Sequence, residues 1–136
     1  MQLNPYLSFD GNCREAFQFY EKVLGGKIVA MMTWAETPMK DQSPPETHNK
    51  IVHARLIAGE DVLMGRDAPG GQYRKPQGIT VTINTEEPIE AERIFQALSE
   101  GGAVMMPIAE TFWARRFGML TDRYGTPWMI NCEKPM

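Results

Sequence analysis

Two stretches of this sequence follow the same order of segments, and this internal repeat limits the fold more than any other feature. The first copy begins with a strand-like "NPYLSF" and continues with a helix-like "NCREAFQFYEKVLGG". The second copy begins with "GITVTIN" and continues with "EEPIEAERIFQALSEGG". In both copies a strand with a doubled methionine follows a glycine pair, and two further strand-like segments come after it. A repeat of several elements in one order predicts a duplicated β-α-β-β-β module.

The helix of each copy shows apolar residues at the i, i+3, i+4, i+7 spacing of one helix face. These predicted core positions are Ala16, Phe19, Tyr20 and Val23 in the first copy and Ala91, Ile94, Phe95 and Leu98 in the second. Asn12 is the expected N-cap of the first helix, with Glu15 placed three residues later as in a capping box. Pro88 suits the first turn of the second helix, and the glycine pairs at 25–26 and 101–102 end both helices.

The repeat divides the 136 residues into module one (1–66), a linker (67–77) and module two (78–136). The linker is rich in glycine and proline, as connecting segments often are. This length suits one domain, or two small halves that share a core. We therefore expect a fold of the α+β class, built from two βαβββ modules.

One segment, residues 35–49, has no counterpart in the second copy. It reads "AETPMKDQSPPETHN", with three prolines and many polar residues. Long loops in compact domains are either functional or disordered. The segment is therefore either a lid over a binding site or a disordered surface insertion.

Composition excludes several classes of function. The net charge is −3, from 14 basic and 17 acidic residues, and no basic stripe indicates a nucleic-acid partner. No apolar run approaches the roughly 18 residues of a membrane helix, and the N-terminal segment does not resemble a signal peptide. Cys13 and Cys132 form no CxxC pair, and we expect both to be reduced and structural. The expected location is cytoplasmic, with no membrane partner.

Three stretches carry a family resemblance, and together they span most of the chain: "PYLSFDGNCREAFQFYEKVLGG", "HARLIAGEDVLMGRDAP" and "ETFWARRFGMLTDRYGTPWMIN". They resemble the PhnB-like branch of the vicinal oxygen chelate (VOC) superfamily, the glyoxalase and bleomycin-resistance fold. The resemblance implies half-open barrels, a ligand cleft enclosed by paired modules, and a homodimer. Such proteins are sometimes labelled 3-demethylubiquinone methyltransferases. No Gly-rich loop joins a strand to a helix here, so we expect no cofactor.

Metal-dependent members of that superfamily carry His, Gln or Glu ligands on the first and last strands of each module. The corresponding positions in this sequence fall near Asn4, Leu63, Gly78 and Met129. None of these residues is His, Asp, Glu or Cys, the types that zinc and non-haem iron sites need. A site with two histidines would require both His48 and His53, and His48 lies in the proline-rich segment. We therefore expect no metal.

Strand alternation predicts which side chains face the cleft. In the first strand Leu7 and Phe9 should pack on the helix and leave Tyr6 on the cleft side. In the first strand of the second copy Ile79 should pack inward and Thr80 should face the cleft. The predicted ligand-binding side chains are Tyr6, Trp34, Arg55, Thr80, Trp113, Arg115 and Met129. One member of each doubled methionine pair, Met31–Met32 and Met105–Met106, should be buried.

The segments "VHARL" and "FWARR" hold the residues with the most reactive or selective side chains. Their alignment predicts that Trp113 corresponds to His53 and Arg115 to Arg55. His53 is either a general base near neutral pH or a hydrogen-bonded histidine in a sheet. The two arginines suit a carboxylate or phosphonate group, because a guanidinium donates two parallel hydrogen bonds. Glu110 could act as an acid or base if it is buried.

These residues support two hypotheses about function. The first is a protein that binds or sequesters a small organic ligand without a divalent metal. The second is an enzyme of the isomerase, lyase or transferase type that acts on a small organic acid, with His53 or Glu110 as acid or base. As an alternative to a ligand-binding role, Arg55 and Arg115 form structural ion pairs with Glu110 or Asp122.

Overall fold

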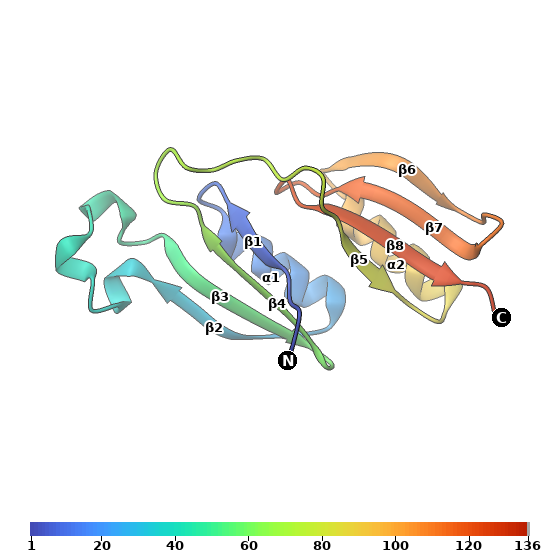
Figure 1. Cartoon of the computed structure of the whole chain (residues 1–136), viewed down its shortest axis with the longest axis horizontal. Helices are drawn as coiled ribbons and strands as arrows, with labels where there is room; N and C mark the ends of the chain where they lie inside the picture. The colour runs from blue at the N-terminus through green and yellow to red at the C-terminus, as the bar shows by residue number, and fades with distance from the viewer. Residues whose placement is uncertain (136) are drawn as a thin grey trace. The chain divides into compact units, whose positions relative to one another are not determined.

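The computed structural model describes residues 1–135, which form two compact units that meet between Arg74 and Lys75 in the sequence (Figure 1). Each unit contains one four-stranded sheet and one α-helix, in the element order β-α-β-β-β. The predicted α+β class and the duplicated module are therefore confirmed. Neither sheet is closed into a barrel.

The first unit contains one sheet with a helix against one of its faces. Its elements are β1 (Tyr6–Phe9), α1 (Cys13–Leu24), β2 (Lys27–Thr33), β3 (Ile51–Ala58) and β4 (Asp61–Asp67). Three short 3₁₀ helices lie between β2 and β3: η1 (Trp34–Glu36), η2 (Lys40–Gln42) and η3 (Pro45–Thr47). The strand order is β1-β4-β3-β2, in which β1 is parallel to β4 and the other pairs are antiparallel.

The second unit repeats this arrangement without the three 3₁₀ helices. Its elements are β5 (Val81–Asn84), α2 (Pro88–Ser99), β6 (Ala103–Ala109), β7 (Ala114–Thr121) and β8 (Pro127–Glu133), with the strand order β5-β8-β7-β6. The prediction that Ile79 packs inward is wrong. The strand begins only at Val81, and Ile79 is 80% exposed. In the described part of the chain, no helix is both long and apolar enough to cross a bilayer.

Each helix covers its sheet with the residues that its apolar spacing selects. In α2 the four predicted core residues are all buried, and Pro88 begins the helix as expected. In α1 the prediction failed at one position, because Phe17 is buried whereas Phe19 is only partly buried. The buried face of α1 is wider than the predicted stripe of apolar residues and includes Phe17, which contacts the sheet at Gly65.

The start of α1 is stabilised by a residue that the sequence pattern did not indicate. Asn12 makes no side-chain capping bond, so the predicted capping box is wrong. Asp67, at the end of β4, accepts hydrogen bonds from the backbone N–H of Cys13 at 2.9 Å and of Ile51 at 2.8 Å. A carboxylate 54 residues away in the chain therefore satisfies the first N–H group of the helix.

Strand register shows how the two modules correspond residue by residue. Lys27 pairs with Ile57 in the first unit, as Ala103 pairs with Thr121 in the second. Both sheets then have a bulge at the same place, after Ile28 and after Val104. This register matches His53 with Phe117 and Arg55 with Met119. The sequence alignment of His53 with Trp113 was therefore wrong by four positions, since it followed similar letters and ignored the strand pairing.

The doubled methionines are also not equivalent in this register, and none of them is fully buried. Met105 and Met106 are 65% and 44% exposed, because β6 is the edge strand of its sheet and Met105 lies in its bulge. In the first unit Met31 is partly buried and Met32 is 42% exposed. The prediction that one methionine of each pair belongs to the core is therefore wrong.

Candidate functional site

The face of the first sheet opposite α1 gathers basic and aromatic side chains, and we call it the open face of the first sheet. Alternation along the strands defines it: the paired residues Leu56 and Leu63 are buried toward α1, whereas the next pair, Arg55 and Met64, faces the other way. Its central residues are Tyr6, Met32, His53, Arg55, Met64 and Arg66.

The two arginines of this face are partly buried and have no carboxylate partner among the described residues. Nη1 of Arg55 lies 3.9 Å from Sδ of Met64, which is a weak acceptor. Within residues 1–135 the ion pairs found are Arg93–Glu90, Arg116–Glu92 and Lys134–Glu110, and none involves Arg55 or Arg66. Two partly desolvated guanidinium groups without a counter-ion make this face suitable for an anionic group.

Tyr6 and His53 contribute rings and polar atoms beside these arginines. Their ring centroids lie 6.1 Å apart with an interplanar angle of 31°. Burial raises the pKa of Tyr6, and the positive charge of Arg66 offsets part of that rise. The Tyr6 phenol therefore keeps its proton at neutral pH and can donate a hydrogen bond. The predicted positions of Tyr6, His53 and Arg55 thus share one face.

The corresponding open face of the second sheet carries no charged residue at its central positions. These positions hold Thr82, Asn84, Met106, Phe117, Met119, Met129 and Asn131. The Thr82 hydroxyl donates to Sδ of Met129 at 3.7 Å, and Nδ2 of Asn131 donates to Oδ1 of Asn84 at 3.0 Å. Oδ1 of Asn131 is buried without a hydrogen-bond partner among the described residues. This face can therefore accept a donor group from a ligand or water.

Three predicted residues of the second unit lie at or beyond the ends of its strands. Thr80 directly precedes β5 and is partly buried. Trp113 is 45% exposed and contacts Phe112 and Phe117 edge-on, at centroid distances of 4.7 and 5.3 Å. Arg115 donates to the carbonyl oxygens of Glu133 at 3.1 Å and of Glu86 at 3.0 Å. Its guanidinium is therefore engaged by the backbone, unlike those of Arg55 and Arg66.

Glu110 and Asp122 are both engaged by groups other than Arg55 and Arg115. Glu110 forms an ion pair with Lys134 at 3.1 Å, and its side chain is 64% exposed. The Glu110 carboxylate therefore lies mostly in contact with water and is not buried in a cleft. The carboxylate of Asp122 accepts from the N–H groups of Tyr124 and Thr126 and from Nε1 of Trp128, so it holds the β7–β8 turn.

Trp34 lines a pocket of its own within the first unit. It begins η1, just beyond the end of β2, and lines a pocket together with residues of η2, η3 and the segment after β4. Tyr6, His53 and Arg55, with which the sequence grouped Trp34, are not among the residues that line this pocket.

Several residues of the two open faces escaped the sequence-based prediction, namely Arg66, Asn84, Phe117, Met119 and Asn131. For Arg66 a signal existed, because it alternates with Gly65, which faces α1, in the strand "VLMGRD". For Phe117 and Met119 the false alignment of "FWARR" with "VHARL" hid the equivalence.

The donor set of these faces does not fit a divalent metal. Leu63, one of the four positions compared with superfamily ligands, faces α1 and is buried. The open-face residues of the outer strand pairs offer hydroxyl, thioether, amide and guanidinium groups, which are poor ligands for zinc or iron, and His53 on β3 adds a single imidazole. His48 does not reach them, because its Nε2 lies 3.0 Å from the carbonyl oxygen of Lys40 and 3.3 Å from that of Ser43. No cluster of three His, Cys, Asp or Glu residues occurs within residues 1–135.

Comparison with known proteins shows which protein family this chain matches. Residues 1–131 match the model of the family described as 3-demethylubiquinone-9 3-methyltransferase. Protein YjdN of Escherichia coli is 36% identical over 143 aligned residues, which cover 98% of this chain and 97% of YjdN.

Two solved structures share the fold over nearly the whole chain. The protein PA1353 from Pseudomonas aeruginosa is 46% identical, with a TM-score of 0.90 and coverage of 99% of both chains. The PhnB protein from Bacillus cereus is 22% identical, with a TM-score of 0.81 and coverage of 97% of this chain and 99% of that one. At this lower identity the likeness shows the fold alone.

Proposed function

The chain belongs to the family described as 3-demethylubiquinone-9 3-methyltransferase, the PhnB-like branch of the VOC superfamily, and on that premise we propose that it binds a small organic anion on the open face of its first sheet. The observation that carries the proposal is the pair of partly buried arginines, Arg55 and Arg66, without carboxylate partners in the described chain. An anion would supply the missing counter-charge where water is partly excluded.

The chemistry of the neighbouring side chains narrows the ligand class. A guanidinium donates two parallel hydrogen bonds and so favours carboxylate or phosphonate groups. Tyr6 adds a protonated hydroxyl, and the rings of Tyr6 and His53 offer a flat surface for the organic part of the ligand. We propose that the arginines, and not a divalent cation, hold the anionic group, in line with the poor metal donors around them.

Binding is better supported than catalysis. The His53 ring lies beside the ring of Tyr6, and no hydrogen-bond partner among the described residues orients it as a base. Glu110 is exposed and ion-paired. The family description names a methyl transfer, but the turns before α1 and α2 read "DGN" and "TEE" and lack the glycine-rich sequence that commonly binds nucleotide-like cofactors. We therefore do not extend the proposal to that reaction.

Isothermal titration calorimetry with benzoate, phenylphosphonate and neutral benzamide tests the proposal. We expect the protein to bind at least one anion and to bind benzamide more weakly. In Arg66→Gln the affinity for the anion should fall about tenfold, which corresponds to about 1.4 kcal/mol. Added salt should weaken binding in the wild type more than in the variant.

Arg115→Gln is the matched control, because its guanidinium is already engaged by two carbonyl oxygens. Its affinity for the anion should stay within about twofold of the wild type. An equal loss of anion affinity in Arg115→Gln and Arg66→Gln would contradict the assignment of the anion site to the first sheet. Unchanged anion binding in both Arg66→Gln and Arg55→Gln would contradict it as well. Turnover of a bound acid that His53→Ala abolishes would favour the enzyme hypothesis instead.

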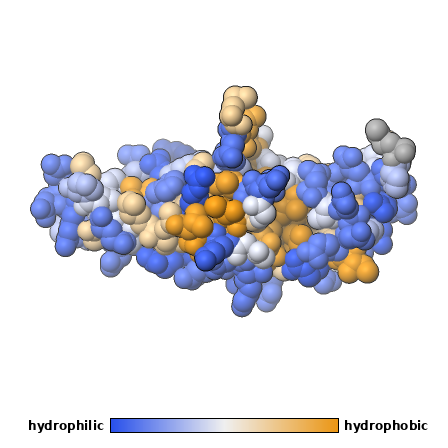
Figure 2. Space-filling view, turned by 90° about the horizontal axis from the view of Figure 1, so that it is seen from below, coloured by the Kyte–Doolittle hydropathy of each residue, from blue (hydrophilic) through white to orange (hydrophobic). Residues whose placement is uncertain are grey.

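We also infer that the protein is a homodimer. Figure 2 shows apolar areas that interrupt the hydrophilic surface on the side that it draws, and the exposed large apolar residues include Val104, Met105 and Met106 on the edge strand β6. Exposed apolar edge strands favour association with another chain. A cytoplasmic location stays a prediction, in accord with the two free, buried cysteines.

A further inference from the structure

The insertion between β2 and β3 helps to form a pocket of roughly 330 Å³ within the first unit. We propose that this pocket binds a neutral, planar ring compound, and that it is a site separate from the anion site on the open face. The proposal does not depend on anion binding, because it rests on different residues and a different ligand chemistry.

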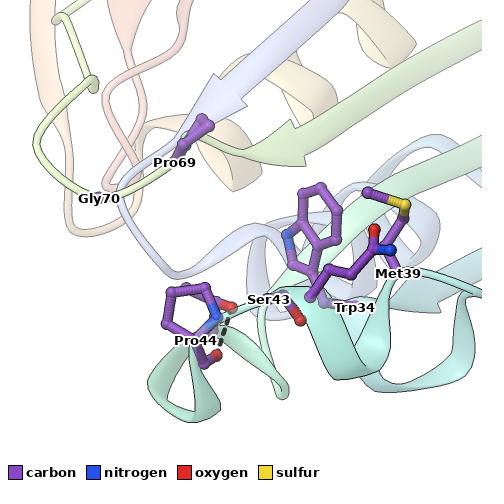
Figure 3. Close-up of a pocket in the computed structure, with 8 residues that line it drawn as sticks. Trp34, Met39, Ser43, Pro44, Pro69 and Gly70 are labelled. Carbon is purple, nitrogen blue, oxygen red and sulfur yellow. Dashed lines mark hydrogen bonds between the residues drawn. The ribbon is translucent and has the colours of Figure 1, made fainter.

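The walls of the pocket are mainly rings and apolar groups. The lining residues are Trp34, Met39, Gln42, Ser43, Pro44, Thr47, Pro69 and Gly70. Figure 3 shows the indole of Trp34 between Met39 on one side and Ser43 and Pro44 on the other, whereas Pro69 and Gly70 come from the segment after β4. The indole offers a flat surface against which a planar molecule stacks, and the two proline rings add apolar walls.

The lining contains no ionisable side chain, which indicates a neutral ligand. Its two hydroxyls are already engaged, because Ser43 donates to the carbonyl oxygen of Lys40 at 2.9 Å and Thr47 donates to that of Pro44 at 2.7 Å. The amide of Gln42 remains available for one polar group of a ligand. A charged group here would lose water without gaining a counter-ion, which is costly.

The pocket is held open by hydrogen bonds within the insertion. Glu36 accepts from the backbone N–H of Thr33 at 3.0 Å and from its hydroxyl at 2.8 Å, and this capping box fixes the start of η1. The His48 ring contacts two carbonyl oxygens across the segment, and the N–H of Trp34 donates to the carbonyl of Lys50 at 3.2 Å. The insertion therefore has local structure of its own, with three 3₁₀ helices and hydrogen bonds between them.

A folded pocket loses little conformational freedom when a ligand enters, so more of the contact energy appears as affinity. Its volume lies at the lower end of the range of small-molecule sites. One or two fused rings are therefore the fitting size class. The second module has no segment that corresponds to this insertion, so we expect one such site in each chain.

Fluorescence titration and calorimetry with 1-naphthaleneacetamide test the assignment on the full chain. We expect saturable binding with quenching of tryptophan emission. Trp34→Leu should weaken binding at least tenfold. Gly70→Leu should weaken it similarly, because the leucine side chain would extend from the lining and take up space that the ligand needs. A Cβ at Gly70 meets nothing within 4 Å, so this change should cause no backbone strain. Trp113→Leu, in the second unit, should change affinity less than twofold.

Each alternative outcome overturns the proposal. Undiminished binding in both Trp34→Leu and Gly70→Leu would show that the probe binds elsewhere. A tenfold loss of affinity for the probe in Arg66→Gln would show that it binds on the open face. The absence of saturable binding up to the solubility of the probe would remove the site altogether. Gly70→Leu guards against a folding defect in Trp34→Leu, and thermal unfolding of each variant shows which of them are folded.

Discussion

Gly65 occupies a place in β4 where a larger side chain would force its neighbours to shift. A Cβ at this position would lie 2.8 Å from Cε1 of Phe17 and 2.9 Å from the carbonyl oxygen of Leu7. In the second unit Gly118 lies beneath Phe95 in the same way, with a Cβ distance of 2.6 Å. The strand register does not make these two glycines equivalent, since one lies in β4 and the other in β7. Each module thus uses its own glycine to bring a helical phenylalanine onto the sheet.

We expect Gly65→Ala to lower the free energy of unfolding by about 2 kcal/mol, because an overpacked core must shift side chains or backbone. Urea unfolding followed by circular dichroism measures the change. Gly70→Ala is the control, since its Cβ would meet no atom within 4 Å, and its effect should stay within about 0.5 kcal/mol. Similar stability of Gly65→Ala and Gly70→Ala would show that Phe17 and its neighbours yield without cost.

Cys13 should make the stability of the protein depend on pH in the alkaline range. Burial, and to a lesser extent the carboxylate of Asp67, raises the pKa of its thiol in the folded chain. The folded state therefore keeps a proton that the unfolded state loses above about pH 8.5, the ordinary pKa of a thiol. The stabilisation is complete below that pH and declines as the pH rises above it.

The measurement compares the free energy of unfolding of the wild type and Cys13→Ala between pH 7 and 10. The wild type should lose stability relative to the variant above pH 8.5, with a slope approaching about 1.4 kcal/mol per pH unit. Parallel curves over this range would mean that the Cys13 thiol ionises equally well in both states.

At the scale of secondary-structure elements, Asp67 joins the end of β4 to the starts of α1 and β3. We expect Asp67→Ala to lower the free energy of unfolding by about 3 kcal/mol, because two buried N–H groups lose a charged acceptor. Asp67→Asn keeps one amide oxygen and should fall between the wild type and Asp67→Ala. Asp61→Ala, at the exposed start of the same strand, should cost less than about 0.5 kcal/mol in the same chemical denaturation experiment. If Asp61→Ala lowered the free energy of unfolding as much as Asp67→Ala, the hydrogen bonds of Asp67 would not be what links these elements.

The sequence predicted those elements whose signals are local. The spacing of Ala91, Ile94 and Leu98 marks the buried face of α2, since each contributes to one stripe of a single helix. The capping of α1 was missed because its acceptor, Asp67, approaches only after the sheet has formed. Pattern arguments based on neighbours along the chain, such as the Asn12 capping box, do not contain that information.

The candidate site was predictable to the extent that alternation along a strand decides it. Alternation correctly puts Tyr6 and Arg55 on one face, because their strands have buried partners that fix the orientation. The environment of Arg115 was not predictable, since the carbonyl oxygens that engage it belong to other elements. The pocket at Trp34 likewise depends on hydrogen bonds inside an irregular segment, for which no periodic pattern exists.

At the scale of the whole molecule, the two modules share their strand arrangement but differ in the side chains of their open faces. Both modules keep the strand order and the bulge in the strand that follows the helix. The positions of His53, Arg55 and Arg66 in the first module are taken by Phe117, Met119 and Asn131 in the second. One open face is thus basic and the other neutral, as expected if the two modules recognise different parts or kinds of ligand.

Association of two chains is the last property that the strands allow us to predict. Light scattering coupled to size-exclusion chromatography should give twice the mass of one chain for the wild type. The double variant Val104→Lys with Met105→Lys should shift the mass toward the monomer, because two charges replace exposed apolar side chains on the edge strand β6. Val29→Lys is the matched control, since Val29 lies in the equivalent bulge of β2 and is 50% exposed. A monomeric wild type would contradict the homodimer, and loss of the dimer in Val29→Lys alone would move the interface to the first module.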